Sequence, residues 1–492
     1  MNRSYTQMRR MPGRALSLFP RSRVLCALVL TGVLTACGGG SNSSAGPGTT
    51  TTPAPAAKTA VQINMGDSPA DWMLAFSMNI SSMSLTGSNG SVSVTSSSAV
   101  PMEMMHLMGT MQPLAMISAP QGTYTGATVT LGSATVTYMD PATKTLVQQT
   151  LSGPMTGSVT FSAPVTVGST PMAMGFDLNL AKSVTSNNGT LSMNPVFDVS
   201  AGAQGSGNPM DFSDGGIQQM MGSISSVSGS TFVMAPMEAA QSFTFATGPS
   251  TVFDGTSMSG MSSGMLAIVD ATLQPDGSLL ATRVQSMTGA GGMMGGGMVT
   301  AVTGSPVSEI TLVMQNGIGA GMMSSYLAQG ATVDLTGSTA YRIDEDDVDV
   351  SGLPFTPVFD ASHLYAGQSV MPISSGGMMA GGGGMMGGGG MGSGMMAGTI
   401  TASTLELEPQ GLTGTVASAI QSGGSGSFTL TLPGDCAFTT LTGASSVTVY
   451  QQTGTTVAGG SSIASGSTVH AFGLLFYDGG QWKMVASRVS AN

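Results

Sequence analysis

Methionine is the residue type in this sequence whose abundance and spacing most clearly suggest chemistry. The chain has 42 methionines among 492 residues, and a tract over residues 376–398 interleaves them with glycine. The methionines of this tract are Met378, Met379, Met385, Met386, Met391, Met395 and Met396. Thioether sulfur is a soft ligand that suits Cu(I) or Ag(I), and glycine would let several sulfurs converge. These residues are therefore candidate ligands for a soft metal ion, and no other cofactor is predicted.

A shorter tract at residues 289–297 and the segment 102–116, which contains His106, are further candidate clusters for a soft metal ion.

The abundance of methionine also has two interpretations that do not involve a metal ion. Methionine also fills protein cores as an adaptable apolar residue, and glycine-rich tracts can arise by low-complexity drift. Exposed methionines can also act as an oxidant sink, because their sulfoxides are reduced again by dedicated enzymes.

The residues that could catalyse a reaction or hold a hard metal ion form no recognisable motif. Residues 344–349 are rich in carboxylates, which suit Ca²⁺, but they do not match the EF-hand pattern. His106, His363 and His470 are far apart in the sequence. No set of nucleophile, base and orienting partner is visible. We therefore expect a protein that is not an enzyme.

The N-terminal residues have the features of an export signal. Six arginines precede a short apolar stretch at residues 24–33, which is too short for a permanent membrane-spanning helix. The residues Leu34-Thr35-Ala36-Cys37 that follow resemble the lipobox of bacterial lipoproteins. This resemblance implies that residues 1–36 are removed as a signal peptide and that Cys37 is lipidated, whereas an ordinary secretory signal is the alternative. Gly38, in place of Asp, implies sorting to the outer membrane, with the periplasmic or the external face left open.

Beyond the predicted signal peptide the chain is strongly acidic. The first 36 residues contain six of the 13 lysines and arginines and none of the 24 acidic residues, so the remainder has a formal charge of −17. Such a chain repels nucleic acid, which we exclude as a partner. We expect instead the membrane, reached through the lipid on Cys37, and an envelope protein or a glycan. Cys436 then has no cysteine to pair with, and we interpret it as a small core residue.

The composition changes after Cys37 and again near residue 59. Residues 37–58 consist mostly of Gly, Ser, Thr, Pro and Ala, which predicts a flexible tether. Residues 59–202 then show short stretches of alternating apolar and polar residues, such as 61–65 and 76–80, separated by turn residues. The phase of the alternation shifts near residue 81, which predicts a β-bulge. Together these patterns favour an antiparallel β-sandwich.

A family resemblance covers roughly residues 60–200. It rests on Asp67-Ser68-Pro69, on the segments 102–107, 120–124 and 180–183, and on residues 194–197, in that order. These residues resemble the family called domain of unknown function 4382, which occurs in bacterial envelope lipoproteins. The resemblance implies a β-sandwich and assigns no activity. Within it, residues 102–108 are expected to form a short helix with Met102, Met105 and Met108 on one face.

Three copies of one pattern fill residues 219–288, 296–410 and 411–492. Each copy opens with a glycine-led strand and closes with Ala-Thr-Arg, Ala-Ser-Thr or Ala-Ser-Arg, and its last two strands are predicted to form a hairpin. In the second copy the Met/Gly tract stands at the hairpin tip, where we expect it to be exposed and mobile. The copies resemble the family called domain of unknown function 5666, small β-barrel-like modules found in series in exported bacterial proteins. No catalytic residues come with this resemblance.

The sequence thus predicts an all-β protein with an N-terminal antiparallel β-sandwich, three small β-barrel-like modules and flexible Gly/Met loops. Its predicted role is that of a lipid-anchored cell-envelope protein for binding, adhesion or scaffolding, without catalysis. Soft-metal binding or sequestration by the Met-rich loops is the first alternative, and a methionine oxidant sink is the second.

Overall fold

A computed structural model describes residues 56–68, 70–95, 98–107, 110–203, 215–286, 295–316, 327–345, 348–374, 396–418, 426–458 and 463–491. All of these belong to one compact unit that begins at Pro55. The predictions made for the signal peptide, for Cys37, for most of the tether and for Met378, Met379, Met385, Met386, Met391 and Met395 concern residues outside the described ranges. Met396 is the first residue of a strand, β22 (Met396–Leu407).

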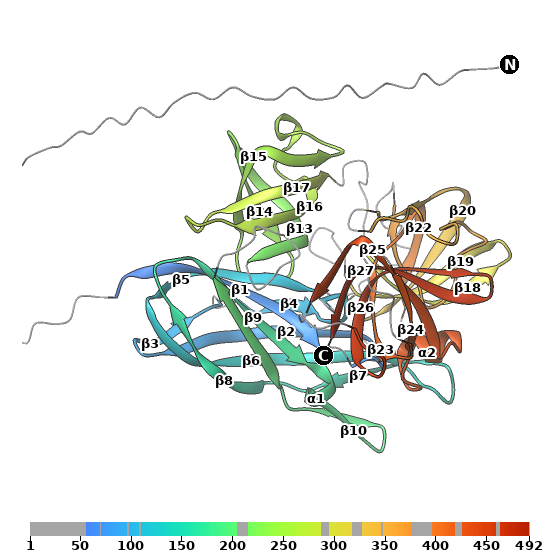
Figure 1. The fold of residues 1–492 in the computed structure, drawn as a ribbon, viewed down its shortest axis with the longest axis horizontal. Helices are drawn as coiled ribbons and strands as arrows, with labels where there is room; N and C mark the ends of the chain where they lie inside the picture. Colours follow the sequence, from blue (N-terminus) through green and yellow to red (C-terminus); the bar gives the residue numbers. More distant parts are fainter. Residues whose placement is uncertain are drawn as a thin grey trace, which may run out of the picture. The chain divides into compact units, whose positions relative to one another are not determined.

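The prediction of an all-β fold is confirmed, because strands make up most of the described chain (Figure 1). The two α-helices are single short segments, α1 (Leu180–Ser183) and α2 (Ala437–Thr442). In the part of the chain that the structure describes, no helix has the length and apolar character needed to cross a membrane.

Two sheets form the N-terminal sandwich. The first has the order β12 (Phe197–Ala203), β9 (Met172–Asn179), β1 (Lys58–Ser68), β5 (Met111–Pro120). The second has the order β3 (Gly90–Ser93), β2 (Met73–Gly87), β6 (Gly122–Met139), β7 (Leu146–Leu151), with β4 (Val100–Glu103) on β2 and β8 (Met155–Val167) on β6. A separate hairpin joins β10 (Val184–Asn187) to β11 (Thr190–Met193). Both main sheets contribute to one core, which includes Ile63, Phe76 and Phe176.

The sandwich differs from the sequence-based expectation in two places. Its strand pairs are antiparallel except for β1 and β9, which run parallel. The prediction of a helix at residues 102–108 is wrong. Met102 and Glu103 are the last residues of β4, and Met105–Leu107 forms one 3-10 turn. The apolar residues of this segment satisfy a strand followed by a turn as well as they satisfy a helix, since Met102 and Met105 are both buried in the core. The β-bulge predicted near residue 81 is present, between Ile80 and Ser82.

Three closed five-stranded barrels follow the sandwich. Barrel 1 has the order β13 (Gly216–Ser228), β14 (Thr231–Pro236), β15 (Phe243–Asp254), β17 (Leu279–Ser286), β16 (Leu266–Leu273). Barrel 2 has the order β18 (Gly297–Gly304), β19 (Val307–Met314), β20 (Gly330–Ile343), β22, β21 (Ser369–Ile373). Barrel 3 has the order β23 (Gln410–Val416), β24 (Gly426–Thr431), β25 (Ser446–Ala458), β27 (Gln481–Ala491), β26 (Thr468–Asp478). In each barrel the last two strands form an antiparallel pair, and the last strand closes on the third in parallel.

A glycine before the fourth strand has the same backbone conformation and the same hydrogen bond in all three barrels. Gly264, Gly367 and Gly466 have φ angles of +85°, +95° and +86°, which residues with a Cβ adopt only with strain. Each glycine donates its N–H, at 2.8 Å, to a carbonyl of the first strand: that of Ile224, Val299 or Val416. The left-handed turn therefore brings the fourth strand back onto the first and helps to close the barrel.

A threonine in the third strand is also shared by the three barrels. Thr251, Thr339 and Thr455 lie where the pairing of the third strand with the last strand shifts register. Each hydroxyl accepts the N–H of the residue three positions earlier, at 2.8 Å, and donates to the carbonyl of Ala281, Ala402 or Ala486. The hydroxyl thus satisfies two backbone groups that the bulge removes from the ladder.

The barrels contact the sandwich through equivalent connections, those between their second and third strands. In barrel 1, Ala240 donates its N–H to the carbonyl of Leu114 at 2.8 Å. In barrel 2, the side chain of Gln315 donates to the carbonyl of Leu74 at 2.6 Å. In barrel 3, the N–H of Ala437, at the start of α2, donates to the backbone carbonyl of Asp71 at 2.6 Å.

Candidate functional site

A cavity of about 120 Å³ lies where the sandwich meets the three barrels. The sandwich lines it with Pro101, Met105, His106, Thr110 and Gln112, and barrel 1 with Gln218, Gln219, Met221, Met237, Glu238, Ile268, Asp270, Arg283 and Gln285. The remaining lining residues are Met298, Gln315, Asn316, Leu327, Asp344, Ser369, Met371, Glu406, Glu408 and Pro409 near barrel 2, and Gln410, Gly411 and Phe472 of barrel 3. The four modules therefore build this cavity together.

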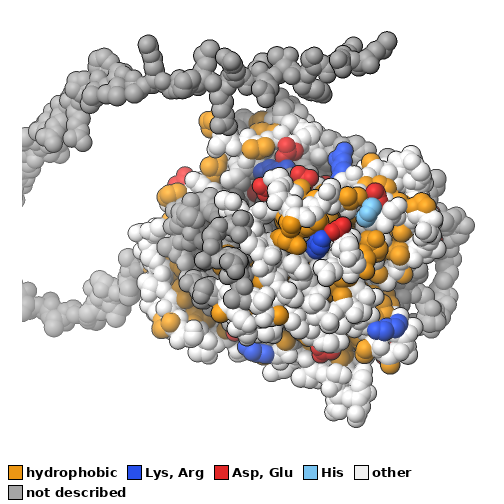
Figure 2. Space-filling view, turned by 45° about the vertical axis from the view of Figure 1, so that its right-hand side comes forward, with side chains coloured by type: hydrophobic (Ala, Val, Ile, Leu, Met, Phe, Trp, Pro, Cys, Tyr) orange, Lys and Arg blue, Asp and Glu red, His pale blue; other side chains and the backbone are white. Residues whose placement is uncertain are grey.

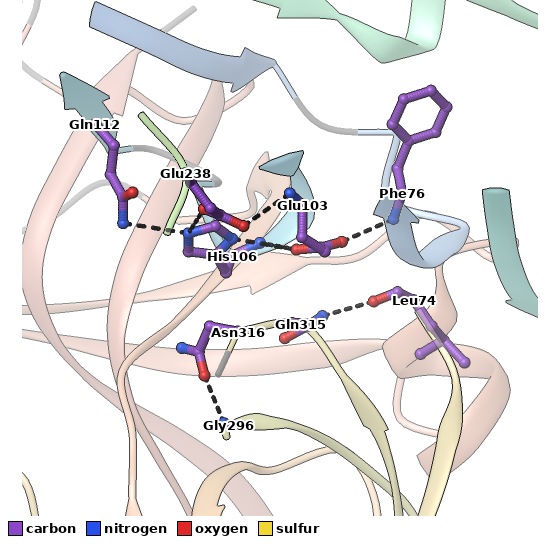
Figure 3. Close-up of polar contacts among 9 residues, drawn as sticks. All are labelled: Leu74, Phe76, Glu103, His106, Gln112, Glu238, Gly296, Gln315 and Asn316. Atoms are coloured by element: carbon purple, nitrogen blue, oxygen red, sulfur yellow. Dashed lines mark hydrogen bonds and ion pairs between the residues drawn. The ribbon is translucent and has the colours of Figure 1, made fainter. Parts of the chain in front are cut away.

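One wall of the cavity holds a histidine between two glutamates (Figure 3). His106, in the 3-10 turn after β4, has its Nδ1 3.2 Å from Glu103 Oε2 and its Nε2 3.2 Å from Glu238 Oε2. Glu238 belongs to the β14–β15 connection of barrel 1 and also accepts the backbone N–H of Glu103 at 3.0 Å. These contacts join barrel 1 to the sandwich by charge as well as by backbone hydrogen bonds.

The two glutamates keep His106 in its charged form. Burial lowers the pKa of His106, but the charge of Glu238 and the hydrogen bonds to Glu103 and Glu238 outweigh burial and raise this pKa to about 10. Burial raises the pKa of Glu103, and its bonds to His106 and to the N–H of Phe76 offset part of that rise. At neutral pH His106 is thus an imidazolium that donates from both ring nitrogens and has no lone pair for a metal ion.

A second buried carboxyl group lies behind this wall. Asp67, near the end of β1, is 4% exposed, and neither of its carboxyl oxygens has a hydrogen-bond partner among the described residues. Burial, followed by the charges of Asp177 and Glu103, raises the pKa of Asp67 well above its usual value. Burial without a hydrogen-bond partner therefore favours the neutral form of the Asp67 carboxyl group over the charged form.

The composition of the cavity wall is unusual for a chain with so few charges. Five of its described residues are carboxylates and two, His106 and Arg283, are cationic. The remaining polar groups are mostly amides, such as Gln112 and Asn316, and five lining residues are methionines. Arg283 already contacts Asp254 at 2.7 Å. The wall therefore combines more acidic than basic side chains with hydrogen-bonding amides and soft thioethers.

The histidines do not come together in the structure. His363 pairs with Asp360 at the surface, with 2.8 Å between Nδ1 and Oδ1. His470 is buried in barrel 3, where its Nδ1 lies 3.0 Å from Thr413 Oγ1. His106 reaches the cavity, but Met102 and Met105 of the same segment are core residues of the sandwich, with Met105 also touching the cavity. Met108 lies outside the described residues.

Two further sequence-based interpretations concern Cys436 and the acidic cluster, the carboxylate-rich residues 344–349. Cys436 is 3% exposed, lies in the core of barrel 3 and caps α2 by accepting the N–H of Thr439. Burial raises the pKa of this thiol, as expected for a core residue.

The described aspartates of the acidic cluster lie in different surroundings. Asp344 lines the cavity, whereas Asp349 accepts the N–H of Ser351 in a turn. Within the described ranges, no group of three or more His, Cys, Asp or Glu residues is placed to hold a metal ion.

Residues 221–285 match the family described as domain of unknown function (DUF5666). This match covers most of barrel 1, so the resemblance noted for that copy is confirmed. Residues 60–200 gave no match to domain of unknown function 4382, and that resemblance stays a prediction. A search of curated proteins found none that matches.

Several residues of the site were missed by sequence analysis. Glu103 and Glu238 are isolated acids in the sequence, and Glu406 is accompanied only by Glu408; the three residues lie in three different modules. The only local signal was the pair Glu103 and His106, which have the i, i+3 spacing at which side chains on one turn meet. Their partner from barrel 1, Glu238, is 135 residues from Glu103 in the sequence, and no pattern within one segment could have revealed it.

Proposed function

We propose that this protein is a non-catalytic, lipid-anchored binding protein of the bacterial cell envelope whose central cavity takes a small cationic ligand. The observation that carries the proposal is the cavity itself, which the sandwich and all three barrels line together. Ligand sites occur preferentially at interfaces between domains, where several elements supply groups to one concave surface.

The charge of the wall supports a cationic ligand. Carboxylates of four segments line the cavity: Glu238 in the β14–β15 connection, Asp270 in β16, Asp344 after β20, and Glu406 and Glu408 at the end of β22. Inside a concave wall of low polarisability, charges of one sign reinforce one another and raise the local concentration of the opposite ion. Figure 2 shows a face of the molecule on which acidic and basic side chains are few compared with uncharged groups.

The way the modules are joined supports binding over catalysis. The ionisable groups best placed to transfer protons, His106 and the two glutamates beside it, bond to one another and hold barrel 1 against the sandwich. Barrels 2 and 3 are joined in turn by Gln410, which donates to the carbonyl of Gly367 at 2.9 Å and accepts the N–H of Ser369 at 2.6 Å. A pre-assembled cavity loses little conformational entropy when it binds a ligand.

The membrane attachment is proposed from the sequence alone. The lipobox-like residues that end at Cys37 support lipidation, and acyl chains on one residue hold a soluble domain at a membrane. Residues 38–55 would then separate the folded unit from the lipid. A tandem array of rigid modules on such a tether presents its binding site away from the membrane surface.

A thermal-denaturation screen of the full chain tests the proposal. The probes are putrescine and spermidine as small cations, sucrose as a neutral solute and citrate as an anion. We expect the amines alone to raise the melting temperature, with an effect that weakens at high salt because the attraction is electrostatic.

The variant for this screen is Glu406→Gln/Glu408→Gln, which removes two charges from the cavity. The matched control is Glu309→Gln/Glu345→Gln, which removes two charges from residues that do not line it. The proposal requires the amine effect to shrink in the cavity variant and to persist in the control. Equal amine effects in all three proteins, or none in the wild type, would contradict it.

A further inference from the structure

Three methionines from two barrels meet on one side of the cavity. Met371 of β21 is 4% exposed, and Met221 of β13 and Met237 of the β14–β15 connection pack against it. All three also line the cavity. The three side chains therefore belong to one cluster that lines the cavity.

The strand register explains why the side chains converge. Gly222 pairs with Pro236, so Met221 and Met237 leave neighbouring strands of barrel 1 at the same level. Met221 is also opposite Ile268, which belongs to the same cluster. Met371 comes from barrel 2, and its approach to Met221 and Met237 depends on the two barrels being held together.

The residues around Met371 suit a soft monovalent metal ion. Across the strand pair β21–β22, Met371 is opposite Glu406, and residues directly opposite in a sheet point to the same face. The cluster therefore has three neutral thioethers with a carboxylate beside them and an apolar rim of Leu266, Ile268 and Ile373. Thioethers prefer soft monovalent ions.

We propose that Met221, Met237 and Met371 form a binding site for a soft monovalent metal ion, Cu(I) or Ag(I), on the wall of the central cavity. This inference rests on the proposed role of the cavity as a site for cations and names the cation. His106 is not a ligand of this site, because Glu103 and Glu238 occupy both of its ring nitrogens. The site is also distinct from the Met/Gly tract at residues 376–398.

Titration of the full chain with Ag(I), in nitrate buffer without chloride, tests the site. The variant is Met221→Leu/Met237→Leu/Met371→Leu, because leucine keeps nearly the volume and apolar character of methionine but removes the sulfur. The matched control is Met65→Leu/Met78→Leu/Met83→Leu, three core methionines of the sandwich that do not line the cavity. Cys37, Cys436 and the Met/Gly tract are present in all three proteins and contribute equally.

We expect the cavity variant to lose one equivalent of tightly bound Ag(I), with at least a hundredfold weaker affinity at that site, and the core variant to match the wild type. Identical titration curves for all three proteins would overturn the inference. If putrescine and spermidine still stabilise the wild type in that case, the proposed function stands and only the metal site fails.

A second measurement on the wild type guards against misfolding of the variant. Mild peroxide oxidation followed by mass spectrometry reports the reactivity of each methionine separately. One equivalent of Ag(I) should slow the oxidation of Met221, Met237 and Met371 several-fold, because the metal occupies the lone pair that peroxide attacks. Protection confined to the methionines of residues 376–398 would contradict the site.

Discussion

At the scale of single residues, His106 shows how two modules can be joined by a charge inside the protein. A buried imidazolium is unfavourable unless its charge is compensated. Glu103 from the sandwich and Glu238 from barrel 1 supply that compensation at 3.2 Å each. Removing one member of such a group leaves the others without partners, so the contact also fixes the position of barrel 1.

The raised pKa of His106 predicts how stability depends on pH. In the folded protein this pKa is about 10, and in the unfolded chain it is about 6.5. The stabilisation from the charged histidine is therefore fully present below pH 6.5 and is lost as the pH rises toward 10. We expect the free energy of unfolding, measured with urea, to fall over this range by at least about 1 kcal/mol more in the wild type than in His106→Gln.

His363→Gln is the control for this measurement. Its imidazole also pairs with an acid at i, i+3 spacing, but this pair lies at the surface, with the His363 side chain 42% exposed. Screening by water makes such pairs weak, so this variant should keep the pH slope of the wild type. A wild-type slope in His106→Gln would show that the buried histidine does not hold its proton as described.

At the scale of elements, the barrels repeat one another in backbone detail that the sequence shows only in part. The glycines before the fourth strand, Gly264, Gly367 and Gly466, all have a positive φ. The threonines of the third strand were missed, although Thr251, Thr339 and Thr455 are at the same place in each copy. An alignment of the three copies would have found them, but their role became clear only from the two backbone groups that each hydroxyl bonds.

The threonine contact can be tested in barrel 3. Thr455→Val keeps the shape of the side chain but leaves the N–H of Gln452 and the carbonyl of Ala486 without this partner. We expect a loss of about 1 kcal/mol in the free energy of unfolding, because the substitution removes one partner of two partly buried hydrogen bonds. The control is Thr453→Val, which changes an exposed threonine of the same bulge and should cost less than about 0.5 kcal/mol. Equal effects of the two substitutions would contradict the proposed role.

At the scale of the whole folded unit, the sequence revealed the modules but not their assembly. Alternating apolar residues in each segment predicted the sandwich strands, because burial of one sheet face leaves a local pattern. The cavity leaves no such pattern, because its lining residues come from four modules and meet only after the barrels dock. Glu103 and Glu238, for example, are 135 residues apart, yet one accepts the N–H of the other.

The contact between barrels 2 and 3 gives a test of this assembly. Gly264, Gly367 and Gly466 have the same backbone conformation, but only Gly367 faces another module, since a Cβ there would lie 2.6 Å from Thr442 Cγ2 and 2.9 Å from Phe438 Cε2. At Gly264 and Gly466 a Cβ would meet no atom of the described residues within 4 Å. Alanine at these two positions should therefore cost only the backbone strain, about 1–2 kcal/mol.

Gly367→Ala should destabilise the protein by at least about 1 kcal/mol more than the other two substitutions, because it adds a steric clash to the same strain. Thermal denaturation of the three variants gives the comparison. If all three lose the same stability, barrels 2 and 3 are not packed together in solution as they are in the structure.

The central claim is that the cavity shared by the four modules binds a small cation, and a crystal structure of the full chain with spermidine tests it most directly. The account predicts density for the amine inside the cavity, with its nitrogens near Glu406, Glu408 or Glu238, and no such density in Glu406→Gln/Glu408→Gln. Spermidine bound elsewhere on the protein, with the cavity holding only solvent, would contradict the claim.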